Sequence, residues 1–227
     1  MRRLPRGGHD GEQVRGEHPR HPQMSADPAA LPPGLAPEDA ARANFYGLLA
    51  RLFYAPPDRA LLAALAGADE IAGQEGGSGL ALAWRELKEG AATLDEDAAR
   101  GEFDALYIGT GKAEVSPYAG AYVKRARADQ QLVALRQYLA QQGLARQPGV
   151  NEPEDHVAAL CDVMRHLIAE QHAALDSQSK FFATFVWPSA AAFCDATEKA
   201  ERAAFYRLAA RFARSFLEVE HALLELG

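Results

Sequence analysis

The apolar residues near the end of the chain recur with the spacing of one face of an α-helix. They are, in order, Phe205, Leu208, Phe212, Phe216, Val219 and Leu223. Steps of three and four residues place these side chains on one side of a helix, because an α-helix completes a turn in 3.6 residues. No part of the sequence shows the alternating pattern of a β-strand. We therefore predict an all-α protein.

Similar runs earlier in the chain predict further helices. The first begins at Pro37 and ends before Pro56, and the others pass through Leu61–Leu65, through Leu80–Leu87, from Asp95 to Tyr107, over residues 126–142, over residues 152 to about 175, and through an aromatic segment interrupted at Pro188. We expect residues 37–227 to form a single helical-bundle domain of roughly nine to eleven helices. Residues 1–36 are rich in Gly, Pro, Arg and His and lack apolar periodicity, which predicts a disordered N-terminal extension.

Composition narrows the class of protein. Of 227 residues, 48% are hydrophobic, which is enough for one sizeable core. Cys161 and Cys194 lie in apolar helical runs without Cys-x-x-Cys spacing, so they indicate reduced core thiols and no metal site. The sequence has no apolar run long enough to span a membrane and no secretory signal, so we expect a cytoplasmic protein.

The charge of the chain is unevenly distributed. The whole chain carries −7, whereas residues 1–23 hold five arginines against three acids, which leaves −9 on the remainder. An acidic body does not suit nucleic acid, whose phosphates need a basic surface. It does suit a basic peptide partner, although many proteins are acidic for solubility alone.

The sequence Asn-Glu-Pro-Glu-Asp-His, which starts at Asn151, has the composition of a helix start. Asn151 is a favourable N-cap, and Glu154 three residues later completes a capping box. Pro153 falls in the first turn, where its missing N–H costs nothing. With Asn151 as the cap, His156 points toward the apolar face of the helix and Asp155 lies at the edge of that face.

Two interpretations of Asp155 and His156 stay open at this point. The pair resembles a general base and its orienting carboxylate, but adjacent helical residues diverge by about 100°. No Ser or Cys nucleophile stands at a recognisable spacing. The alternative is a core histidine beside an aspartate that favours the helix dipole, and the residues alone favour this structural interpretation.

Two other patterns resemble chemical sites only weakly. Gly109-Thr110-Gly111-Lys112 looks like the end of a phosphate-binding loop, but Leu106 replaces the first glycine and Ala113 replaces the hydroxyl residue of that motif. His166 and Glu170 are four residues apart and are better explained as a solvated pair than as metal ligands. We assign no catalytic residue, no metal site and no cofactor.

Three tyrosines accompany a loop rich in glycine, between Tyr107 and Tyr122. Large aromatic side chains with polar tips suit the binding of a peptide, because they cover apolar surface and keep a hydrogen-bonding end. A packed crossover between two helical halves explains the same residues equally well.

Taken in order, these pieces resemble the TorD/DmsD family of molybdoenzyme-specific chaperones. The resemblance is carried by Phe103-x-x-Leu106-Tyr107-Ile108-Gly109, by Pro117-Tyr118-x-x-x-Tyr122 and by the block from Asn151 to His156. It extends from about residue 38 to the end of the chain. The run from Val157 to Arg165 is also similar to the branch that serves type II dimethyl sulfoxide reductase-like enzymes.

The resemblance implies an all-helical, non-enzymatic cytoplasmic chaperone. Such a chaperone binds the twin-arginine signal peptide, or leader, and the apo form of the catalytic subunit of a molybdenum oxidoreductase. It assists cofactor insertion and delays export until assembly is complete. Either a monomer or a domain-swapped dimer fits the family. The positions that match its leader-contact region are Phe103, Leu106, Tyr107, Tyr118, Tyr122, Pro153, Asp155 and His156.

The chain departs from the family pattern at three places. Gly120 stands where a serine is usual, and Gly111 stands where some members carry a tryptophan. The family's His-Leu-x-Pro-Trp is replaced by Phe185-Val186-Trp187-Pro188-Ser189, so the polar contact of that histidine is missing.

Two rival functions stay open. One is a nucleotide-binding or hydrolytic helical enzyme centred on His156 and the loop from Gly109 to Lys112. The other is a helical adaptor for a respiratory complex that does not recognise a leader.

Overall fold

The computed structural model describes residues 34–71, 79–109, 113–145 and 152–226, and these are mostly helical. The α-helices are α1 (Pro37–Tyr54), α2 (Arg59–Ala66), α3 (Gly79–Thr93), α4 (Glu96–Phe103), α5 (Arg125–Gln141), α6 (Val157–Ala169), α7 (Leu175–Phe181), α8 (Trp187–Lys199) and α9 (Phe205–Leu226). Three shorter turns are η1 (Asp104–Ile108) and η3 (Phe182–Val186), both π-helical, and η2 (Ala119–Tyr122), a 3-10 turn.

The prediction of an all-α fold is confirmed for the residues that the structure describes, which contain no β-strand. Helix α4 continues into η1, and α7 continues through η3 into α8. When joined helices are counted as one, the described ranges contain eight continuous helices, slightly fewer than the nine to eleven expected. Residues 1–33 lie outside the described part of the chain, so the division at residue 36 stays a prediction.

Local sequence signals explain several helix ends. The Asp58 carboxylate accepts the Leu61 N–H at 2.7 Å at the start of α2, and the Asp95 carboxylate accepts the Ala98 N–H at 2.9 Å at the start of α4. Both are N-caps of the ordinary kind. Helix α5 ends just before Gly143, whose φ of +70° is the left-handed conformation that glycine adopts most easily.

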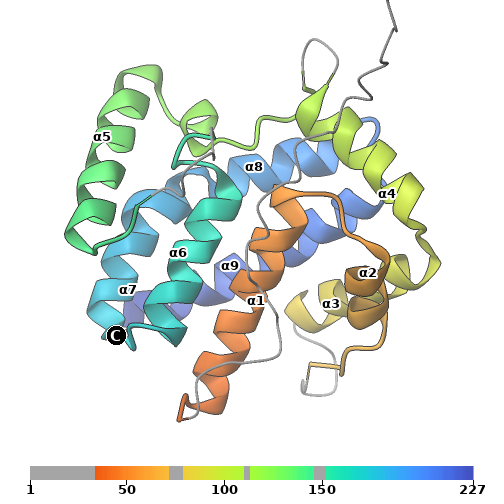
Figure 1. Cartoon of the computed structure of the whole chain (residues 1–227), viewed down its shortest axis with the longest axis horizontal. Helices are drawn as coiled ribbons and strands as arrows, with labels where there is room; N and C mark the ends of the chain where they lie inside the picture. Colours follow the sequence, from red (N-terminus) through yellow and green to blue (C-terminus); the bar gives the residue numbers. More distant parts are fainter. Residues whose placement is uncertain (1–33, 72–78, 110–112, 146–151, 227) are drawn as a thin grey trace, which may run out of the picture.

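Helices α1, α6 and α9 form the centre of the molecule (Figure 1). Helix α1 packs along α6, while α9 packs against α8 and α3. Aromatic rings fill the seams: Phe45 lies edge-on to Phe212 and Phe216, with ring centroids 5.2 and 5.4 Å apart. Helix α5, drawn in green, stands to one side of this centre (Figure 1).

A buried ion pair ties the first helix to the last. Arg42 on α1 donates from Nε and Nη2 to the two carboxylate oxygens of Glu220 on α9, at 2.7 and 2.9 Å. Arg42 also donates to Gln178 on α7 at 2.8 Å. The side chains of Arg42 and Glu220 are 9% and 1% exposed. The buried Glu220 charge is therefore compensated by Arg42, which also pairs with Asp39 at 2.8 Å.

A carboxylate from another helix caps the start of α9. Glu102 on α4 accepts the backbone N–H groups of Ala204, Phe205 and Tyr206 at 2.8, 3.1 and 2.8 Å. The first N–H groups of a helix have no partner within the helix, and a negative charge at this end is favourable. The start of α9 is therefore stabilised by a residue about one hundred positions earlier in the chain.

The helix interruption expected at Pro188 is wrong. Pro188 is the second residue of α8, which directly follows the π-helical turn η3, and the helical run continues through it. The π-helical turn η3 leads from α7 directly into this start. The chain bends there without leaving the helical conformation.

Candidate functional site

Two segments that are distant in the sequence lie side by side at the start of α6. We call residues 115–122 the tyrosine segment and residues 152–156 the acidic segment. Tyr118 and His156 form an isolated antiparallel β-bridge. The Ala119 N–H donates to the Asp155 carbonyl, and the Val157 N–H donates to the Pro117 carbonyl, both at 2.9 Å. The structure thus brings together two of the motifs that the sequence singled out.

Because of this pairing, the helix begins later in the chain than predicted. Asn151 lies outside the described residues, and α6 begins at Val157 with His156 as its N-cap, so a helix starting at residue 152 is wrong. The β-bridge holds His156 in an extended conformation, with φ −61° and ψ 131°, which is incompatible with a helix. The helix also ends earlier than residue 175, at Ala169.

His156 is a buried, neutral histidine. It is 7% exposed, and its Nδ1 accepts the Ala158 N–H at 3.2 Å, which caps α6 and leaves the proton of the neutral ring on Nε2. Burial lowers the pKa of His156 to about 4, although the nearby carboxylates of Glu152 and Asp155 act in the opposite direction. The imidazole is consequently a weak base, and its Nδ1 is occupied.

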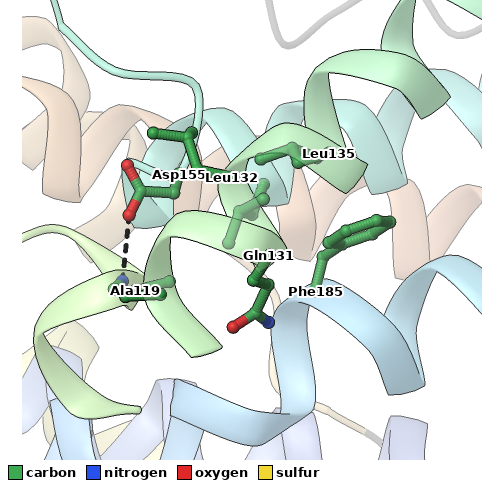
Figure 2. A pocket seen from close by; sticks show the side chains of 9 residues that line it. Ala119, Gln131, Leu132, Leu135, Asp155 and Phe185 are labelled. Atoms are coloured by element: carbon green, nitrogen blue, oxygen red, sulfur yellow. Dashed lines mark hydrogen bonds between the residues drawn. The ribbon is translucent and has the colours of Figure 1, made fainter. Parts of the chain in front are cut away.

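The Asp155 side chain holds the two segments together and lines a small hollow. Its Oδ2 accepts the Gly120 N–H at 2.9 Å, and Figure 2 shows the carboxylate pointing toward this part of the tyrosine segment. A Cβ at Gly120 would lie 3.0 Å from the same oxygen, so glycine allows this close approach. The rest of the hollow is lined mainly by Ala119, Ala128, Gln131, Leu132, Leu135, Leu160 and Phe185 (Figure 2). A carboxylate thus borders a largely apolar recess.

Tyrosine rings surround the histidine. Tyr118 and Tyr54 both lie edge-on to His156, with centroids 5.3 and 6.1 Å away. Burial, and then the Glu152 charge, raise the pKa of both tyrosines. Tyr122 donates its hydroxyl to the Ser116 carbonyl at 2.6 Å, and burial raises its pKa to about 12. All three phenols therefore stay protonated at neutral pH.

Three of the eight predicted contact residues belong to the core. Phe103, Leu106 and Tyr107 are 4%, 0% and 5% exposed. The Tyr107 hydroxyl lies 3.4 Å from that of Thr197 on α8. These side chains lie in the interior behind the segment, while Tyr118, Tyr122, Pro153 and Asp155 are only partly buried. Direct contact between a partner and the three core residues stays a prediction.

Only part of the rival catalytic centre lies within the described residues. Residues 110–112, including Gly111 and Lys112, lie outside the described residues, so the phosphate-loop hypothesis has no structural account. Within the described ranges, no three His, Cys, Asp or Glu side chains are grouped so as to hold a metal ion. No helix among the described residues is long and apolar enough to cross a membrane.

Sequence reasoning missed three residues of this site. Tyr54 lies at the end of α1, and only the tertiary contact with His156 reveals its part. Gln131 and Leu132 come from α5, which looked like an ordinary helix in the sequence. Phe185 was noted for its aromatic character, but its position beside Asp155 depends on the turn η3.

Comparison with known proteins identifies the family of this chain. Residues 74–195, just over half of the chain, match the family model described as nitrate reductase delta subunit. The chain is 29% identical over 141 residues to the chaperone protein TorD of Vibrio cholerae serotype O1 strain M66-2, and 27% identical over 136 residues to TorD of strain ATCC 39315. Each alignment covers 55% of this chain and 62% of the relative, so the chain spans less than two thirds of these proteins. The match does not resolve a branch, but it shows that the chain belongs to the nitrate reductase delta subunit family and, with its TorD relatives, to the TorD/DmsD group.

Proposed function

We propose that this protein is a cytoplasmic chaperone for the maturation of a molybdoenzyme. It binds the twin-arginine leader and the apo form of the catalytic subunit, assists cofactor insertion and delays export until assembly is complete. The curated relatives are named chaperones, which supports a role in assembly and not in catalysis.

One observation carries the leader-binding part of the proposal. Asp155 places a partly buried carboxylate at the border of a largely apolar recess, next to the tyrosine segment. A leader has the complementary order of properties, an arginine pair followed by an apolar stretch. A carboxylate pairs strongly with guanidinium, and tyrosine rings supply apolar area with hydrogen-bonding tips.

The predicted contact residues fall into two groups, those with partly exposed side chains and those with buried side chains. Asp155, Tyr118, Tyr122 and Pro153 are partly exposed and would touch the leader. His156 acts mainly by capping α6 and fixing the acidic segment. Phe103, Leu106 and Tyr107 support the tyrosine segment from the core.

The rival enzyme is not favoured. A histidine with a pKa of about 4 and a capped Nδ1 is poorly suited to act as a base at neutral pH. The named chaperones among the relatives argue in the same direction.

Calorimetry with a synthetic twin-arginine leader from a candidate catalytic subunit tests the proposal. We expect Asp155→Asn to weaken binding about tenfold or more, because a charge-assisted pair is lost, and to lower the free energy of unfolding by only about 1 kcal/mol. Asn keeps an oxygen that can accept the Gly120 N–H, so the fold is retained. Asp97→Asn, at an exposed aspartate in the first turn of α4, is the matched control and should not change binding.

A Lys-Lys version of the same peptide separates charge from geometry. Planar guanidinium groups pair with carboxylates in a way that ammonium groups do not, so we expect weaker binding of the Lys-Lys peptide. Equal affinity for both peptides, or equal losses of binding and stability in Asp155→Asn, would contradict leader recognition at this site.

A further inference from the structure

The apolar surface next to Asp155 is covered in the structure. Leu160 is 2% exposed, Phe185 is 5% exposed and Phe181 is fully buried. The hollow beside Asp155 is too small for a peptide segment, since its apolar lining is almost entirely out of reach of solvent. A partner that places an arginine at Asp155 therefore finds little accessible apolar surface in this hollow.

The element that covers this surface is α5. Its Leu135 is 1% exposed, and Leu132 lines the hollow from the α5 side (Figure 2). Tyr138 packs on Phe181 and Phe185, with ring centroids 5.1 and 5.9 Å apart. Phe181 and Phe185, with Leu160, thus form an apolar floor beneath α5.

The contacts that hold α5 in place are few among the described residues. Leu135 is its one buried large apolar side chain there, while Leu132, Tyr138 and Leu139 are half-buried and Val133 is 52% exposed. Two polar contacts link the described side chains of α5 to the body: Gln131 donates to the Thr184 carbonyl at 2.8 Å, and Arg136 pairs with Glu154 at 2.9 Å. Both contacts are at the surface, where such interactions contribute little.

We propose that α5 is a displaceable cover and that the apolar stretch of the leader takes its place on the floor formed by Leu160, Phe181 and Phe185. This inference rests on the proposed function, because it assigns the arginine of the leader to Asp155 and the following apolar stretch to the floor. The surface favours a leader as the occupant, because a carboxylate lies at one border and aromatic rings lie next to it. Apolar side chains of the leader replace Leu135 and Tyr138, so the floor is buried in both states.

A covalent link across α5 tests the displacement. In Gln131→Cys/Thr184→Cys, a short bismaleimide would tie α5 to η3. Cys161 and Cys194 are buried and burial raises the pKa of both thiols, so they stay unmodified in the folded protein. We expect the linked protein to bind the twin-arginine leader at least tenfold more weakly than the same variant without the linker.

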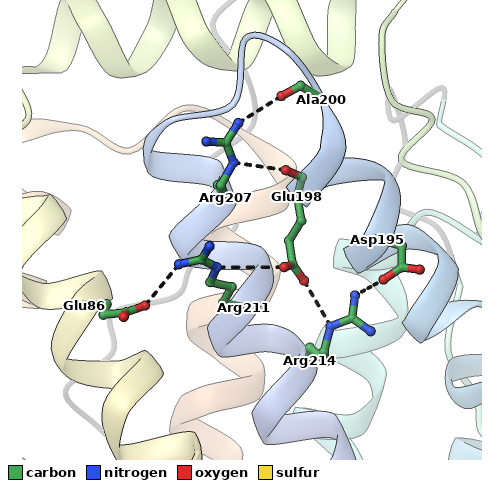
Figure 3. Close-up of polar contacts among 7 residues, drawn as sticks. All are labelled: Glu86, Asp195, Glu198, Ala200, Arg207, Arg211 and Arg214. Atoms are coloured by element: carbon green, nitrogen blue, oxygen red, sulfur yellow. Dashed lines mark hydrogen bonds and ion pairs between the residues drawn. The ribbon is translucent and has the colours of Figure 1, made fainter.

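The matched control links a different pair of helices. Glu86 on α3 and Arg211 on α9 form an exposed ion pair at 3.5 Å (Figure 3), and Glu86→Cys/Arg211→Cys receives the same linker. This link should leave leader binding unchanged. Unchanged binding in the α5-linked protein would contradict the displacement of α5 but not the proposed function. Absence of binding before linking would overturn the proposed function, and the assigned occupant with it.

A single substitution should have the opposite effect and strengthen leader binding. Gln131→Ala removes a hydrogen bond of the covered state, so a larger fraction of molecules is competent to bind. We expect binding to tighten about twofold to fivefold, the factor that corresponds to one exposed side-chain hydrogen bond. The neighbouring exposed Gln130→Ala should have no effect. Unchanged or weaker binding in Gln131→Ala would contradict the displaceable cover.

Discussion

Helices α5 and α9 represent two ways of attaching a helix to the same body. Helix α9 buries ten residues, receives a carboxylate cap from α4 and shares a buried ion pair with α1. On its exposed side, Arg211 and Arg214 form ion pairs with Glu86, Asp195 and Glu198 (Figure 3). Among its described side chains, helix α5 is held by the buried Leu135, a few half-buried side chains and two surface contacts.

This difference separates stability from binding. Removing contacts of α9 should lower the stability of the whole protein, since α8, α3 and α1 all pack on it. Removing contacts of α5 should change local opening and leave global stability almost unchanged. The predictions below examine both sides, beginning with the largest expected effect.

The largest effect is expected at the buried ion pair. Arg42→Met leaves the Glu220 carboxylate buried without its partner, so we expect the free energy of unfolding to fall by about 3–5 kcal/mol. The double variant Arg42→Met/Glu220→Leu should recover most of this loss, because no buried charge remains. Urea denaturation followed by circular dichroism measures both. Arg211→Ala, at a surface pair, is the control and should cost less than about 1 kcal/mol. A similar small loss in Arg42→Met would show that α9 is not attached as described.

An intermediate effect is expected at His156. As pH falls below about 6.5, the unfolded chain binds a proton at this histidine, whereas the folded protein does not until about pH 4. Stability should therefore decrease over this window by on the order of 3 kcal/mol from this residue alone. Asn is a good N-cap that does not titrate, so His156→Asn should reduce the loss between pH 6.5 and 4.

Denaturation at a series of pH values checks this prediction. His172→Asn, at an exposed histidine, serves as the control and should keep the pH dependence of the unaltered protein. The burial of His156 would be contradicted if His156→Asn and the unaltered protein lost the same stability on acidification.

The smallest effect is expected on α5. Arg136→Ala removes the surface pair with Glu154, which should change the free energy of unfolding by less than about 0.5 kcal/mol. Amide hydrogen exchange within α5 should nevertheless become a few times faster, because local opening is easier. The exposed Arg127→Ala on the same helix is the control. A global loss of stability in Arg136→Ala would remove the contrast between the two helices.

Most helices could be predicted from the sequence because their signals are local. The apolar steps of α9, the Asp95 cap of α4 and the glycine after α5 all act within a few residues. The start of α6 could not be predicted, since it depends on the β-bridge between Tyr118 and His156, which are 38 positions apart. A capping pattern at Asn151 does not reveal that competing contact.

The candidate site was predictable to a similar extent. The family resemblance placed Tyr118, Asp155 and His156 in one region, and they are neighbours in the fold. Spacing carries no information about which aromatic side chains face inward, so the burial of Phe103 and Tyr107 was not foreseen. The contribution of α5 depends on long-range packing and leaves no mark in a single sequence.

The cap that Glu102 provides to α9 has a consequence for synthesis. Glu102 is synthesised long before the N–H groups of Ala204 to Tyr206. The interval between the synthesis of Arg42 and that of Glu220 is longer still. Chains fold as they emerge from the ribosome, but here the central pairings require residues made near the end. The nascent protein therefore completes these central pairings only when translation of α9 is nearly finished.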